Sequence, residues 1–171
     1  MKVKLVLLFM CISASTFAQE SIEYQKVISV DSTSKNVLYS NLKQWFVDVY
    51  EVNENRLSLD DKETGVLILK TKFAYDNGKG LAYMRWNGPV TYWLKIETRD
   101  SRFRVSLFDF EHPELGRLTN KEIHSHKGMN KKYHNRFWVD VKVKAEEHSE
   151  VIFNHLNDYI KNVKKRNQDD W

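Results

Sequence analysis

Residues 90–110 read VTYWLKIETRDSRFRVSLFDF, and they contain two runs in which apolar and polar side chains alternate. Alternation with a period of two is typical of a β-strand that buries one of its faces. The buried face is expected to carry Tyr92, Leu94 and Ile96 in the first run and Phe103, Val105 and Leu107 in the second. Asp100-Ser101 separates the two runs as a two-residue turn, so the stretch predicts a β-hairpin.

Four more strand patterns precede this hairpin. They cover residues 21–30, a short segment around Leu57 and Leu59, residues 66–75 and residues 81–86. The pattern over 66–75 is the strongest of the four, because its apolar and aromatic side chains recur at every second position. The polar run 60–65 ends at Gly65 and is expected to form a tight reversal, since glycine tolerates a positive φ.

Two other segments have a helical period. From Ser34 the apolar side chains recur every three or four residues, which predicts an amphipathic helix over 34–52 with Ser32 or Ser34 as its N-cap. Its apolar stripe consists of Val37, Leu38, Leu42, Trp45, Phe46 and Val49. A second helix is predicted over 149–165, with Ser149 as its N-cap. Its stripe consists of Ile152, Leu156, Tyr159, Ile160 and Val163.

Two segments lie between the hairpin and the last helix. Residues 111–136 are rich in His, Lys and Asn, and they predict a long polar loop or insertion. Residues 137–143 predict a further strand, because Val139, Val141 and Val143 alternate with other residues. The order of elements predicts an α+β fold, in which two amphipathic helices cover one face of an antiparallel sheet. We expect a single domain over 19–166 and a frayed tail over 167–171.

The composition is that of a globular domain. The chain has 171 residues, of which 42% are hydrophobic and 29% are charged. These values fit one domain and argue against wholesale disorder. Aromatic residues make up 13% of the chain, which favours a strand-rich core.

The first 18 residues have the pattern of a secretory signal peptide. Lys2 and Lys4 precede an apolar run over 5–12, and the small-residue segment 13–18 ends at Ala18. The apolar run is shorter than the ~20 residues that a transmembrane helix needs, so no transmembrane anchor is expected. The pattern predicts export to the periplasm or the cell surface, with cleavage near Ala18.

Cys11 lies inside this apolar run and would be removed with the signal peptide. The remaining chain would then contain no disulfide, no thiol nucleophile and no cysteine-based zinc site. Its net charge would fall from +4 to +2, with 25 Lys and Arg against 23 Asp and Glu. That balance lacks the strong positive charge of nucleic-acid-binding proteins, so no nucleic-acid partner is expected.

The histidines of the polar segment suggest a metal-binding alternative. They are His112, His124, His126 and His134. The pair His124 and His126 can offer two imidazoles from one side of a strand, and a third ligand would complete a zinc or copper site. Their spacing matches no specific metal motif, however, and a solvated loop is the favoured interpretation. No cofactor is therefore predicted.

Three neighbouring carboxylates raise a second chemical possibility. Asp60, Asp61 and Glu63 can perform acid–base chemistry if burial raises the pKa of one of them. Lys62 lies among them, however, and the run is expected to be an exposed reversal. A turn-forming role is therefore favoured over a catalytic one.

Three tryptophans are candidates for a ligand or partner surface. Trp93 and Trp138 are out of phase with the apolar faces of their expected strands, and Trp86 lies in a neighbouring strand pattern. If the helices cover one face of the sheet, Trp93 and Trp138 point to the other face. There they either lie beneath the 111–136 segment or form an exposed aromatic surface, which usually marks a binding site.

The segment from about Tyr24 to His112 resembles a family of exported Bacteroidetes domains of unknown function with a TBP-like fold. The matching motifs are Lys26-Val27, the helix from Leu38-Tyr39 to Trp45-Phe46, the run Leu59-Asp60-Asp61-Lys62-Glu63-Thr64-Gly65, and the hairpin from Val90-Thr91-Tyr92 to Asp109-Phe110. The resemblance implies a β-α-β-meander-α arrangement and an exported setting. It implies no catalytic residues, and a TBP-like fold does not by itself imply DNA binding.

These observations predict a non-enzymatic binding or accessory module of the cell envelope that uses the aromatic sheet face. Its partner would be an unknown protein, a peptide or an apolar ligand. The alternative is a metal-dependent hydrolase or metal-binding protein that uses His124 and His126. The sequence contains neither a Gly-x-Ser-x-Gly nor a His-Glu-x-x-His motif, which favours the non-enzymatic interpretation.

The exported protein should begin at Gln19, because the signal peptide would be removed after Ala18. Intact-mass spectrometry of protein recovered from the periplasm or the cell surface tests this prediction. An exported chain whose mass still includes residues 1–18 would contradict it.

Overall fold

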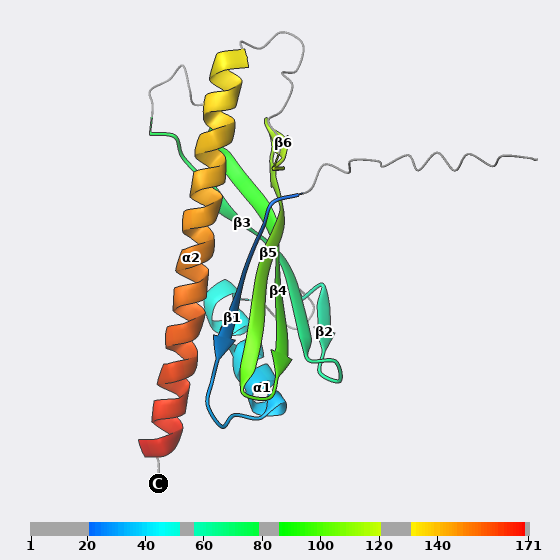
Figure 1. Ribbon diagram of the computed structural model, residues 1–171, viewed down its shortest axis with the longest axis vertical. Helices are drawn as coiled ribbons and strands as arrows, with labels where there is room; N and C mark the ends of the chain where they lie inside the picture. The colour runs from blue at the N-terminus through cyan, green and yellow to red at the C-terminus, as the bar shows by residue number, and fades with distance from the viewer. Residues whose placement is uncertain (1–20, 52–56, 79–85, 121–130, 170–171) are drawn as a thin grey trace, which may run out of the picture.

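The computed structural model describes residues 21–51, 57–78, 86–120 and 131–169. Figure 1 shows the elements in chain order. They are β1 (Glu23–Ser29), α1 (Lys35–Tyr50), β2 (Leu59–Asp61), β3 (Val66–Tyr75), β4 (Gly88–Arg99), β5 (Arg102–His112), β6 (Gly116–Arg117) and α2 (Lys131–Asp169).

The strands form one antiparallel sheet in the order β1-β5-β4-β3-β2, and β6 pairs with β5. The β4–β5 hairpin predicted from the sequence lies at its centre. Leu94 pairs with Leu107 and Ile96 pairs with Val105, and all four side chains are fully buried. The alternation in this hairpin therefore builds one continuous apolar face of the sheet.

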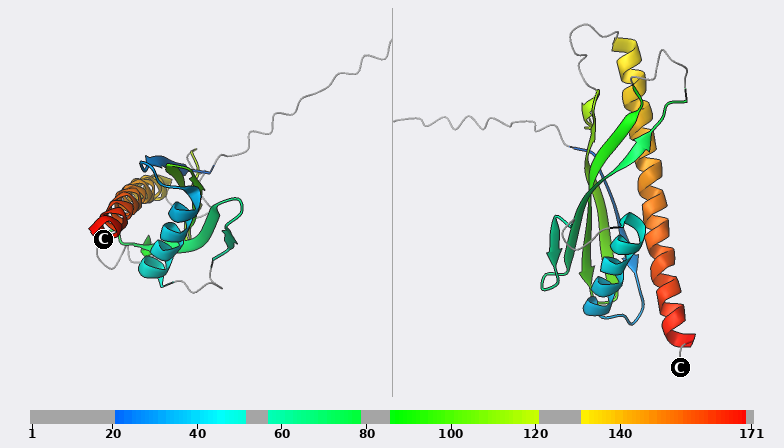
Figure 2. Two further views of the ribbon diagram at one scale, coloured as in Figure 1. Left: turned by 90° about the horizontal axis from the view of Figure 1, so that it is seen from below. Right: turned by 180° about the vertical axis from the view of Figure 1, so that it is seen from behind.

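Both helices cover this apolar face, as Figure 2 shows. In α1 the buried side chains are Leu38, Tyr39, Leu42, Trp45 and Phe46. The two helices also contact each other, because Trp45 Nε1 donates a hydrogen bond to His155 Nδ1 at 3.2 Å and Tyr159 Oη donates one to Asp48 at 2.8 Å. The predicted α+β class, with two helices on one face of an antiparallel sheet, is confirmed.

Helix α1 begins where the sequence predicts. Ser34 is the N-cap residue in an extended conformation, but its side chain makes no capping hydrogen bond. The carboxylate of Asp100, in the β4–β5 turn, instead accepts a hydrogen bond from the Lys35 backbone N–H at 2.8 Å. The predicted apolar stripe was too wide, since Val37 and Val49 are exposed.

Helix α2 corrects two predictions. Residues 137–143 are helical rather than a strand, and Ser149 lies in the middle of α2 rather than at its N-cap. The buried side chains Phe137, Val141 and Ala145 recur every four residues, whereas Val139 and Val143 are exposed. The alternating valines therefore divide between the two sides of a helix. Ser149 fits inside the helix because its hydroxyl donates to the Ala145 carbonyl oxygen at 2.7 Å.

The predicted 111–136 loop was also wrong where the structure describes it. Strand β5 continues to His112, β6 pairs with it, and α2 begins at Lys131. Leu115 and Leu118 between them are buried in the core. Residues 121–130, which include His124 and His126, lie outside the described residues. Among the described helices, none is both long enough and apolar enough to cross a membrane.

A β-bulge at Asp109 changes which side chains of β5 face the helices. Asp109 has a φ of 58°, and one extra residue of β5 lies between the pairs Trp93–Phe108 and Thr91–Glu111. Before the bulge the odd-numbered residues are buried, and after it Phe110 and His112 are buried. The bulge therefore extends the apolar face of the sheet to the end of β5.

The reversal after β2 depends on Gly65, as the sequence predicts. Gly65 has a φ of +79°, which side chains rarely adopt. A Cβ at this position would also collide with the Thr98 side chain, whose hydroxyl donates to the Gly65 carbonyl oxygen at 2.9 Å. The turn therefore needs glycine for its conformation and for its close approach to β4.

Leu156→Asp should lower the free energy of unfolding by about 3–5 kcal/mol, because Leu156 is fully buried in the core and the variant would bury an unpaired charge. Val151→Asp is the matched control, since Val151 lies on the same helix and is 64% exposed. Urea unfolding compares the two variants with the unmodified chain. Equal stabilities of the two variants would mean that this part of α2 does not pack on the sheet.

Candidate binding surface

Trp93 lies on the face of the sheet that the helices do not cover. Its neighbours in β4, Tyr92 and Leu94, are fully buried, and Tyr92 Oη hydrogen-bonds His148 Nε2 of α2 at 2.9 Å. Because successive side chains of a strand point to opposite faces, Trp93 points away from α2. It is half-buried, so part of the indole is open to solvent.

The neighbours of Trp93 extend this surface across the sheet. Phe108 of β5 and Lys70 of β3 are its direct cross-strand partners, and Phe108 is also half-buried. Lys70 Nζ lies 5.5 Å from the centre of the Trp93 ring, in a cation–π contact. Further apolar side chains on the same face are Val27, Leu59, Val66 and Ile68. We call this surface the helix-free face.

A charged network lies next to the aromatic pair. Glu97 Oε1 is 3.1 Å from Lys95 Nζ, and Glu97 Oε2 is 2.7 Å from the Arg104 guanidinium. Burial opposes the ionisation of Glu97, but the hydrogen bonds from Arg104 and Lys95 outweigh it and lower the pKa of the carboxyl. Glu97 is therefore ionised and already paired at neutral pH.

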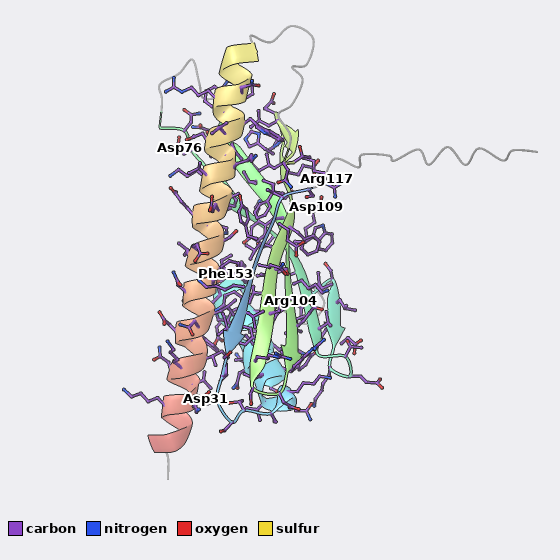
Figure 3. The ribbon with its side chains drawn as sticks, in the orientation of Figure 1. Asp31, Asp76, Arg104, Asp109, Arg117 and Phe153 are labelled. Atoms are coloured by element: carbon purple, nitrogen blue, oxygen red, sulfur yellow. The ribbon has the colours of Figure 1, made fainter. Side chains whose placement is uncertain are left out.

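At the other end of this face, Asp109 forms an ion pair with Arg117 of β6. Figure 3 shows both residues on the side of the sheet away from α2, whereas Phe153 lies between α2 and β1. The bulge that turns Phe110 inward thus leaves the Asp109 carboxylate outside, where Arg117 neutralises it. Trp93 and Phe108 therefore lie between two groups of ion pairs, that of Glu97 toward one end of the strands and that of Asp109 toward the other.

The helix-free face is only slightly hollowed. One hollow of about 410 Å³ lies over β1, β5 and β4, beside Phe108 and the Glu97 network. A second hollow, of about 240 Å³, lies at the end of the β4–β5 hairpin. It is lined by Val27, Glu97, Arg99, Arg102, Phe103 and Arg104. Both hollows are open and lined largely by charged side chains.

Trp138 and Trp86 are not placed as the sequence predicts. Trp138 belongs to α2 and is buried in the core, so its expected position on the open side of a strand is wrong. Trp86 is also buried and stacks on Phe137 of α2, with ring centres 4.9 Å apart. Trp93 is thus the one member of the predicted trio that the structure places on the helix-free face.

Phe108 completes the aromatic pair, although it was not among the predicted site residues. Phe108 follows Leu107, which has the inward phase of β5, so strict alternation already places Phe108 outward. The two-residue turn at Asp100-Ser101 sets the register that brings Phe108 beside Trp93, and the bulge lies beyond this pair.

His112 is a core residue. Its Nδ1 accepts hydrogen bonds from the backbone N–H groups of Glu114 and Leu115 at 3.2 and 3.3 Å, and its Nε2 lies 3.2 Å from the Trp86 carbonyl oxygen. Both nitrogens are satisfied when His112 is neutral and carries its proton on Nε2. In the described parts of the chain, no group of three His, Cys, Asp or Glu side chains could hold a metal ion.

The carboxylates of the Gly65 reversal serve a structural role. Burial opposes the ionisation of Asp60, but Lys43 at 2.8 Å and the Tyr39 hydroxyl outweigh it and lower the pKa of the carboxyl. The pKa of Asp61 is also lowered, chiefly by hydrogen bonds from Thr64. A general acid at neutral pH needs a raised pKa, so neither carboxyl is suited to that role.

His112 should make the fold sensitive to acid. Burial lowers the pKa of the imidazole, with the Trp86 carbonyl opposing the shift. Below pH ~6.5 the unfolded histidine binds a proton that the folded one excludes, so the free energy of unfolding should fall from there through the lower folded-state pKa. Urea unfolding from pH 8 to pH 5 should show a smaller loss for His112→Gln than for the unmodified chain. Equal losses would contradict this account of His112.

Comparison with known proteins identifies the family of this chain. The model of a domain of unknown function (DUF4468) with TBP-like fold matches residues 24–112. A TBP-like protein from Parabacteroides distasonis has a similar structure, with a TM-score of 0.54 and 14% identity, over 83% of this chain and 94% of that one. A DUF4468 family protein from Bacteroides ovatus aligns with a TM-score of 0.45 and 13% identity, over 74% and 84% of the two chains. No curated protein matches the chain. Since the family model spans more than half of the sequence, the chain belongs to the DUF4468 family of domains with a TBP-like fold.

Proposed function

We propose that this chain is an exported, non-enzymatic binding module that holds a protein or peptide partner on its helix-free face. One observation carries the proposal. The two helices occupy one face of the sheet, and the centre of the other face presents Trp93 and Phe108 side by side. Aromatic groups that are partly open to solvent on a sheet are unfavourable in water, and they are typical of surfaces that become buried in a complex.

The composition of this face suits a protein interface. An aromatic centre is surrounded by charged side chains, several of which are already paired, as the Glu97 and Asp109 ion pairs show. Protein interfaces commonly have aromatic residues at the centre, which contribute most of the binding energy, and a polar rim around them. The Lys70 contact restrains the Trp93 ring before binding, which lowers the entropy lost on association.

The shape of the face favours a macromolecule over a small apolar ligand. Small molecules bind in concave, mostly apolar cavities that bury most of their surface. The hollow beside Phe108 is open and is lined by charged and polar groups, including Glu23, Lys95 and Arg104. Such a surface can be covered by another chain but offers little enclosure to a small apolar compound.

The N-terminal sequence supports the exported setting. Lys2 and Lys4, the apolar run and the segment ending at Ala18 have the order of a cleavable signal. The loss of Cys11 with that segment would leave no thiol to oxidise outside the cytoplasm. A binding module of the cell envelope fits both properties.

Site-specific photo-crosslinking in cells tests the proposal. p-Benzoylphenylalanine in place of Trp93, or of Phe108, should give a discrete crosslinked product with one identifiable partner, because the probe would lie inside the interface. The control places the same probe at Val139, which is 56% exposed on α2. The proposal is wrong if neither sheet position gives a product, or if Val139 gives the same product in equal yield.

A further inference from the structure

Two arginines face each other at the end of the central hairpin. Arg99 of β4 and Arg102 of β5 are direct cross-strand partners, and both are exposed. They share the phase of Glu97 and Arg104, so they lie on the helix-free face. With Arg104 they supply three guanidinium groups to the 240 Å³ hollow at this end of the sheet.

The positive charge of this hollow is only partly neutralised. Glu97 is the one carboxylate among the lining residues, and it is already held by Arg104 and Lys95. Arg99 and Arg102 form no ion pair within the described part of the chain. A guanidinium stays charged at any physiological pH, and like charges directly across two strands are destabilising. The repulsion between the two arginines therefore lowers the stability of the folded chain unless an anion from outside the chain neutralises their charge.

The need to protect sheet edges does not explain these arginines. Charged side chains commonly protect the edge of a sheet from pairing with other chains. Strands β4 and β5 are central in the sheet, however, and Arg102 has cross-strand partners on both sides, Ser29 of β1 and Arg99 of β4. The charges also point out of the face of the sheet and not along its plane. The charge of this hollow is instead complementary to an anionic group.

The surroundings of the pair favour carboxylates of a polypeptide over a small free anion. Arg99 and Arg102 are exposed, and the hollow is open, so a small anion would keep most of its water and gain little by binding. Trp93 lies six residues from Arg99 on the same strand and the same face, which corresponds to about 20 Å. An extended peptide of about six residues spans this distance and can contact both groups.

We propose that Arg99 and Arg102 form a carboxylate subsite, and that the partner of the helix-free face is an extended acidic polypeptide segment. Its Asp or Glu side chains bind the two guanidinium groups, and an apolar side chain about six residues away packs on Trp93 and Phe108. Arg–carboxylate pairs suit this role, because the two planar groups form parallel hydrogen bonds. This inference rests on the proposed function, since it specifies the chemistry of the same partner.

Selection from a display library of random 12-residue peptides tests the inference with the full exported chain. Peptides bound at low salt should be rich in Asp or Glu and should carry an apolar or aromatic residue. For a selected peptide, Arg99→Gln/Arg102→Gln should weaken binding at least about tenfold, because two charge-assisted contacts are lost. Lys161→Gln/Lys165→Gln is the matched control, since it removes two exposed positive charges from α2 and should leave the affinity within about twofold.

A Trp93→Ser variant separates the inference from the proposed function. If selected peptides are neutral but still lose binding in Trp93→Ser, the carboxylate subsite is wrong and the binding face stands. If no selected peptide loses binding in Trp93→Ser, both are wrong. An equal loss in the two double variants would assign the effect to net charge and overturn the subsite. Tight binding of inorganic phosphate that depends on Arg99 and Arg102, with no acidic peptide selected, would replace the peptide by a small anion.

Discussion

The packing of α2 along one face of the sheet is the constraint on which the rest of the structure depends. Helix α2 has 39 residues, so it is about 58 Å long and passes along the whole sheet, as Figure 1 shows. Its buried side chains are Phe137, Trp138, Val141, Ala145, Ser149, Ile152, Phe153, Leu156 and Ile160. A helix this long needs a continuous apolar surface beneath it. The inward side chains of the strands provide that surface. Helix α1 lies beside α2, and its Trp45 donates a hydrogen bond to His155 of α2. The helices together use one face of the sheet and leave the other without a helical cover.

The bulge at Asp109 extends the buried face of the sheet to the end of β5, so that more of α2 packs on apolar side chains. Strict alternation in β5 would have turned Asp109 toward the helices and Phe110 toward solvent. One inserted residue reverses this, so Phe110 and His112 extend the buried face and the Asp109 carboxylate pairs with Arg117 outside. Phe108 lies beside Trp93 just before the bulge, in the register that the two-residue turn of the hairpin sets. A single local irregularity therefore extends the core to the end of β5 and places the Asp109 ion pair on the opposite face.

Sequence periodicity predicts the central hairpin, strand β3 and α1 correctly, because each buries one face and its apolar side chains follow one period. It fails at 137–143, where Val139 and Val143 are exposed valines of a helix and imitate the alternation of a strand. It fails at Ser149 because serine usually marks a helix start, whereas here a small side chain fits the buried stripe and bonds back to Ala145. Trp93 could be assigned to the outer face from the phase of its strand alone. The predicted two-residue turn already sets Phe108 opposite Trp93 and Arg99 opposite Arg102. The bulge at Asp109 and the neighbours in β1 and β3 needed the folded structure.

The central proposal is that the helix-free face is the binding surface of this domain. It follows from the division of the sheet into one face that the helices bury and one that carries Trp93. A ¹H–¹⁵N NMR titration with an acidic peptide obtained by selection tests it most directly. The account predicts shifts of the Trp93 indole N–H and of the backbone amides of Phe108, Arg99 and Arg102, with the exposed outer side of α2 unchanged. Shifts concentrated on α2, around Val139 or Val151, would contradict it.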